Sequence, residues 1–284
     1  GASMLDFLLS LGLWQLTVTV LGIALAVGFG FSVGIQKVFR LRASVQEADL
    51  AIDLMQVTST YIGILLAFAG VLAWQDFKDA DTAVESEAAV TSQLYRDLAA
   101  YGPAMDPARQ ALRAYVQSVV VDAWPLLREG KRSPVTEEKL LIVFNEVASV
   151  APTDERESAI YREAFSRMNE VVSMRRQRLA AARQDVPPVL WIVALVGSIL
   201  TIAYASAFVS SRYALLMIAG TSLTIGLLFL FLLSVDYPFR NRNGVSDAPF
   251  VELKSVFDTI DRFSARMRAP PPRAPSPLGG TAAT

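Results

Sequence analysis

The stretch that decides the fold is LMQVTSTYIGILLAFAGVLAWQ, residues 54–75, which holds 22 residues without a single charge. A helix rises ~1.5 Å per residue and the hydrocarbon core of a bilayer is ~30 Å thick, so this stretch is long enough to cross a membrane. Three further charge-free stretches occupy residues 7–36, 186–211 and 213–235, with 30, 26 and 23 residues. The sequence therefore predicts an all-α membrane protein with four transmembrane helices.

We expect these helices near residues 11–35, 54–75, 188–209 and 213–235. Only three residues separate the last two, which predicts a tight antiparallel hairpin. The resulting divisions are a cloning remnant at 1–3, transmembrane helices 1 and 2 within 4–75, a soluble insert at 76–185, transmembrane helices 3 and 4 within 186–236, a C-terminal helical segment at 237–268, and a tail at 269–284.

Small residues recur at four-residue spacing in the first predicted span, at Gly22, Ala26, Gly30 and Gly34. On a helix they form one stripe, and such a stripe lets a second helix approach closely. The sequence therefore predicts a helix-packing contact along this face.

The composition excludes much catalytic chemistry. The chain contains no cysteine and no histidine, which rules out disulfides, thiolate nucleophiles, Ser-His-Asp hydrolysis and the usual zinc sites. A net charge of -1 gives no argument for a nucleic-acid partner. We expect no enzymatic activity, no cofactor and no metal site.

Helical signals run through the whole insert. Asp106-Pro107 and Ser133-Pro134 each place a capping residue before a proline, which is typical of a helix start. We expect helices near 77–101, 106–129, 134–150 and 153–184, and a further amphipathic helix near 249–263. The tail from residue 269 is too poor in large apolar residues to pack, so we expect disorder there.

Basic residues flank the predicted spans unequally. Seven lie near the membrane on the side of the insert and both termini, against four on the other side. Because cytoplasmic loops carry the excess of Lys and Arg, this count predicts a cytoplasmic insert and cytoplasmic termini.

A signature ends the fourth predicted span, where Asp236, Pro238 and Phe239 form an acidic-x-Pro-Phe motif. A second motif is the apolar segment 62–72 followed by the acidic segment 79–88. Trp-Pro at 124–125 and MRRQRL at 174–179 accompany them. Together these motifs resemble the bestrophin channels, and most closely the bacterial bestrophin-like membrane proteins. We interpret Asp236 as structural, positioning the turn that Pro238 makes.

The resemblance implies a homopentamer in the inner membrane of a bacterium, with membrane lipids around it. It also implies that inorganic ions pass through a pore lined by the second transmembrane helix. Calcium-binding bestrophins carry an acidic cluster beyond the signature, whereas residues 240–247 here include two arginines and a single aspartate. We therefore expect no calcium clasp, which needs several oxygen ligands.

Three apolar residues, Ile64, Phe68 and Leu72, recur every four residues on one face of the second span. By resemblance this face makes the narrow apolar neck of the bestrophin pore. An apolar constriction gates by dewetting, because hydrated ions do not fit a dry ring. The alternative is that these residues face lipid or a neighbouring helix.

An acidic run follows the span and comprises Asp76, Asp79, Asp81, Glu85 and Glu87. In a symmetric pore each position becomes a ring of carboxylates at the mouth, with Asp76 and Asp79 nearest the membrane. Such a ring attracts cations and repels anions, which predicts a weak cation preference. The alternative is an ordinary solvated helix face.

A basic run comprises Arg175, Arg176, Arg178 and Arg183, which precede the third span. We interpret them as anchors at the membrane surface, where anionic headgroups favour cations. The sequence as a whole predicts an oligomeric, passively conducting bestrophin-like channel. The alternative is a non-conducting membrane scaffold or sensor whose helical insert recruits a partner.

Overall fold

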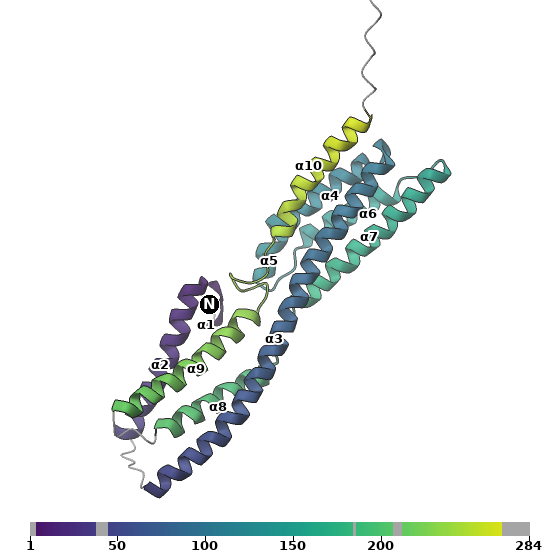
Figure 1. Ribbon diagram of the computed structural model, residues 1–284. Helices are drawn as coiled ribbons and strands as arrows, with labels where there is room; N and C mark the ends of the chain where they lie inside the picture. Colours follow the sequence, from purple (N-terminus) through teal and green to yellow (C-terminus); the bar gives the residue numbers. More distant parts are fainter. Residues whose placement is uncertain (1–3, 38–44, 184–185, 207–211, 269–284) are drawn as a thin grey trace, which may run out of the picture.

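The computed structural model describes residues 4–37, 45–183, 186–206 and 212–268 (Figure 1). Within these ranges the regular structure is entirely helical, as the sequence predicts. The helices are α1 (Met4–Ser10), α2 (Leu13–Lys37), α3 (Val45–Tyr101), α4 (Asp106–Ser118), α5 (Trp124–Arg128), α6 (Pro134–Ala148), α7 (Glu155–Ala181), α8 (Pro188–Ser206), α9 (Arg212–Val235) and α10 (Ala248–Arg268), with a short 3₁₀ turn at Pro103–Met105 and a π-helical turn at Val119–Ala123.

Four helices are long and apolar enough to cross a membrane, and they confirm the four predicted spans. They are α2, the first half of α3, α8 and α9. The predicted hairpin turn between α8 and α9 lies outside the described residues, as do the predicted remnant at 1–3 and tail at 269–284. The sequence did not predict α1, which is joined to the segment after α9 by an ion pair between Asp6 and Arg240.

The helix α3 joins the two parts of the molecule (Figure 1). It has 57 residues, so it extends for about 85 Å. No proline or glycine follows Gly70 until Gly102, and the helix therefore leaves the membrane segment without a break. It ends where Gly102 adopts a φ of 122° and Pro103 follows.

The extramembrane domain contains the second half of α3 together with α4 to α7 and α10 (Figure 1). Its core is one cluster of buried side chains that draws on every one of these helices. The predicted cap at Ser133 is present, since its Oγ accepts a hydrogen bond from the Thr136 amide. Asp154 caps α7 in the same way, with its Oδ1 accepting from the Glu157 amide. The predicted cap at Asp106 is wrong, because Asp106 lies inside the first turn of α4 and Met105 occupies the N-cap position without a side-chain hydrogen bond.

The predicted single helix at 106–129 is interrupted by the π-helical turn Val119–Ala123. Pro125 has no N–H with which to bond the carbonyl of residue 121, and the chain accommodates this with a wider turn just before it. The amide of Trp124 accordingly bonds the Val119 carbonyl, five residues back.

Close glycine contacts hold the membrane helices together, but they are not those of the predicted stripe. A Cβ added at Gly22, Gly30 or Gly34 would meet open space, so this stripe has no partner helix within the described chain. The contact between α2 and α9 instead uses Gly226, where an added Cβ would lie 2.8 Å from the Ala24 Cβ. Neither the methyl of Ala24 nor the two helix backbones can rotate away from such a clash.

This contact gives a stability prediction with a control on the same helix. We expect Gly226→Val to destabilise the protein by about 1–3 kcal/mol, because α2 and α9 must move apart. Gly220→Val, where an added Cβ meets nothing within 4 Å, should leave stability unchanged or slightly raised. Thermal unfolding in detergent micelles measures both, and equal melting temperatures for the two variants would contradict the α2–α9 contact.

Candidate functional site

One apolar face of α3 is uncovered within the membrane segment. The exposed fractions are 62% for Ile64, 69% for Phe68 and 39% for Leu72. Ala69 and Ala73, on another face of the same helix, are 1% and 0% exposed, since α8 and α9 pack there. The three predicted neck residues therefore lie together on a face that the packing of a single chain does not use.

The acidic residue Asp79 continues this face out of the membrane segment. It follows Leu72 by seven residues, which is close to two helical turns, and its side chain is exposed. Asp76, one turn closer to the membrane, is half-buried. Both predicted mouth residues thus lie where α3 leaves the apolar segment, and Asp79 is the better aligned with the neck residues.

A hollow of about 320 Å³ lies beside Asp79, between α3 and α7. Thr82 and Ser86 of α3 and Gln177 of α7 contribute to its wall. These side chains offer oxygen atoms of the kind that hydrated cations contact. Within the described residues, however, no group of three acidic side chains is close enough to hold a metal ion.

Glu87 does not belong to the solvated acidic face, and that alternative is wrong for this residue. It is 0% exposed, because it lies on the side of α3 that packs into the extramembrane core. Its Oε2 accepts a hydrogen bond from Arg178 Nε at 2.7 Å, and its Oε1 accepts one from the Tyr115 hydroxyl at 2.5 Å. Glu87 is therefore the acid of a buried ion pair.

The predicted membrane anchoring is likewise wrong for Arg178, which is 1% exposed, and for Arg175, which is 9% exposed. The guanidinium carbon of Arg178 lies 5.9 Å from the ring centroid of Trp124 and 5.5 Å from that of Phe250. Phe239 of the predicted signature meets Trp124 edge to face, with ring centroids 5.8 Å apart. Arg178 thus sits in an aromatic cage, where cation–π attraction supplements the ion pair.

The environment fixes the charges of this cluster. Burial alone would lower the pKa of Arg178, but attraction and hydrogen bonding to Glu87 outweigh it and raise that pKa. Burial and the neighbouring Glu87 carboxylate raise the pKa of Tyr115 well above its ordinary value. Tyr115 therefore remains a neutral donor and Arg178 a cation throughout the physiological pH range.

Asp236 ties the end of α9 to the start of α8. It is 1% exposed, and its two oxygens accept hydrogen bonds from the Val186 amide at 2.7 Å and the Trp191 indole N–H at 2.9 Å. The Pro238 carbonyl accepts instead from the Val245 amide at 2.8 Å. The two bonds to Val186 and Trp191 join Asp236 to the start of α8 and to the segment before it.

Two solved structures have a similar fold. One is a bacterial bestrophin homologue from Klebsiella pneumoniae, with a TM-score of 0.57, and the other is described as a membrane protein, with a TM-score of 0.58. Each is 16% identical to this chain, and each alignment covers 88% of this chain and 98% of the other. No curated protein sequence matches this chain.

These observations define a multi-pass, all-helical membrane protein with a bestrophin-like fold. The sequence pattern of the Bestrophin-like domain matches residues 16–250, which is most of the chain. The chain therefore belongs to the bestrophin-like family, and the predicted resemblance is confirmed. The family is one of channel proteins and not of enzymes.

The buried pair yields a second stability prediction. We expect Arg178→Met to cost about 3–5 kcal/mol of unfolding free energy, because it leaves Glu87 buried without its cation. Arg167→Met is the matched control on α7, since Arg167 pairs with Glu163 and Glu170 at a partly exposed position. Its cost should stay below about 1 kcal/mol.

Guanidinium denaturation in micelles, followed by tryptophan fluorescence, measures these differences, since Trp124 is buried beside Arg178. Adding Glu87→Gln to Arg178→Met should recover part of the loss, because the unpaired charge is then removed. A double variant that is less stable than Arg178→Met alone would show that the pair is not the source of the loss.

Proposed function

We propose that this protein is an oligomeric channel that conducts ions passively along α3, with a weak preference for cations. The observation that carries the proposal is the uncovered apolar face of α3, which leads from the membrane segment to the exposed Asp79 carboxylate. Membership of the bestrophin-like family supports it. No covalent step is involved, since conduction needs only a path of suitable width and charge.

The pathway is formed between copies of the chain. A single chain leaves Ile64, Phe68 and Leu72 uncovered, so several copies are needed to surround a central path with this face. We adopt the pentamer that the bestrophin resemblance implies. The open stripe at Gly22 and Gly30 supports the assembly, because it offers a second copy a surface for close helix contact.

The neck acts through dewetting. Rings of Ile64, Phe68 and Leu72 offer no hydrogen bonds, so a narrow neck stays dry and blocks ions until it widens. Beyond the neck, Asp79 and Asp76 raise the local concentration of cations. The Debye length is ~8 Å at physiological salt, so these carboxylates act across a mouth one or two screening lengths wide.

We place the protein in the inner membrane of a bacterium, with the extramembrane domain and both termini in the cytoplasm. The larger number of basic residues on that side supports this orientation. Burial of Arg175 and Arg178 reduces the excess of basic residues on that side, because buried arginines do not face the headgroups.

Phe68 provides the test of the neck. We expect Phe68→Ala to raise single-channel conductance or open probability by about twofold or more, because a wider ring wets more readily. Phe29→Ala is the control, since Phe29 is 41% exposed on the membrane helix α2 and lies outside the proposed neck. Recordings in planar bilayers measure both. An unchanged current in a correctly assembled Phe68→Ala oligomer would remove Phe68 from the pathway.

The two mouth carboxylates provide the test of selectivity. In a salt gradient the reversal potential of the unmodified channel should lie on the cation side. The double variant Asp76→Asn, Asp79→Asn should move it toward zero, because the ring then carries no charge. Glu138→Gln, an exposed carboxylate on α6, is the control and should leave the potential unchanged.

Three results would count against this proposal. An anion-side reversal would contradict the cation preference, and a cation-side reversal untouched by the double variant would place selectivity elsewhere. A complete lack of current from the assembled oligomer would favour the non-conducting scaffold that the sequence also allowed.

A further inference from the structure

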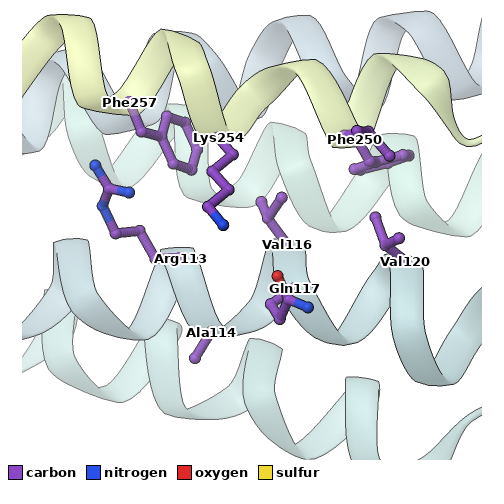
Figure 2. Close-up of a pocket in the computed structure, with 9 residues that line it drawn as sticks. Arg113, Ala114, Val116, Gln117, Val120, Phe250, Lys254 and Phe257 are labelled. Carbon is purple, nitrogen blue, oxygen red and sulfur yellow. The ribbon is translucent and has the colours of Figure 1, made fainter.

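A groove of about 460 Å³ lies between α4 and α10, on the extramembrane domain (Figure 2). Two cationic side chains, Arg113 of α4 and Lys254 of α10, extend into the gap between the two helices in Figure 2. The remaining wall is mostly apolar and comprises Ala114, Val116, Val120, Phe250, Val251 and Phe257, with Gln117 as a further polar group. Its volume is in the range of sites for small organic ligands.

The groove exists because α10 is held to α3 and to one end of α4. Phe257 stacks on Tyr95 of α3 with ring centroids 3.9 Å apart. Asp258 and Asp261 of α10 both form ion pairs with Arg113 at 2.8 Å. Small and β-branched side chains of α4 and the π-helical turn, Ala114, Val116 and Val120, line the groove beside these contacts. The anchoring contacts therefore hold the groove open.

The two cationic side chains of the groove differ in whether they have an ion-pair partner. Arg113 is already paired with two aspartates. Lys254 is exposed, and no hydrogen bond or ion pair of its side chain occurs among the described residues. Val251 beside it is 54% exposed, so an unpaired ammonium lies next to uncovered apolar surface. This combination suits a ligand with one negative charge and an apolar body.

We propose that this groove binds a soluble organic monoanion, specifically a carboxylate carried on an aromatic ring or a short apolar chain. The carboxylate meets the Lys254 ammonium, and the Gln117 amide N–H₂ is a second donor. The apolar body covers Val120 and Val251. Asp258 and Asp261 lie close to Arg113 and disfavour a multiply charged ligand such as a nucleotide.

This site is distinct from the proposed ion pathway and does not depend on it. The matched family region ends at residue 250, so the wall supplied by Lys254 and Phe257 lies beyond that region. A ligand bound in the groove would affect the contact between α10 and the rest of the domain, because the ligand and Asp258 both lie near Arg113.

Photocrosslinking of the full chain in detergent micelles tests the proposal. The probe is 4-benzoylbenzoate, a benzophenone carboxylate, and its uncharged amide is the control probe. We expect the carboxylate to label peptides that contain residues 113–120 or 250–257, as mapped by mass spectrometry. Lys254→Gln should reduce this labelling by about fivefold, the effect of losing one partly exposed charge pair.

Two further variants keep the test sharp. Val251→Glu places a negative charge, of the same sign as the probe, at an exposed position of the wall. It should also reduce labelling, without disturbing the core. Lys131→Gln removes an exposed lysine that pairs with Glu129 away from the groove, and should change nothing. Equal labelling by the amide, labelling confined to the membrane helices, or groove labelling that survives both Lys254→Gln and Val251→Glu would overturn the proposal.

Discussion

The ion pair between Glu87 and Arg178 is the interaction on which the extramembrane domain depends. Removing two charges from water costs several kcal/mol for each ion, so the pair persists only with good compensation. The Tyr115 hydroxyl and the rings of Trp124 and Phe250 supply it. These five residues come from α3, α7, α4, α5 and α10, and the pair therefore fixes the position of α3 against all of them.

Because α3 is continuous, the position that the ion pair gives it in the extramembrane domain also affects its membrane segment. One unbroken helix carries both Phe68, on its uncovered face, and Glu87, in the buried pair. Because a helix fixes the rotation between any two of its residues, locking Glu87 also sets the direction of Phe68 relative to the extramembrane domain. The packing of the extramembrane domain therefore also determines the orientation of the proposed neck residues.

The sequence predicted the elements that depend on neighbouring residues, but it did not predict contacts between residues far apart in the chain. The four spans and the cap at Ser133 follow from short patterns, so they could be predicted directly from the sequence. Four-residue spacing also placed Ile64, Phe68 and Leu72 on one face. The pairing of Glu87 with Arg178 joins residues 91 positions apart, and runs of like charge around each of them indicated solvated surfaces instead. No pattern in the sequence distinguishes the buried members of such a run from the exposed ones.

The place of Phe250 in the aromatic cage bears on how the protein is made. A ribosome delivers Glu87 and Arg178 long before Phe250, and Phe239 follows only after the last membrane helix. Until that helix has been inserted, the charge pair lacks half of its aromatic covering. The extramembrane core can therefore be completed only after the last membrane helix has been inserted. The segment that follows this helix supplies the last aromatic ring of the core.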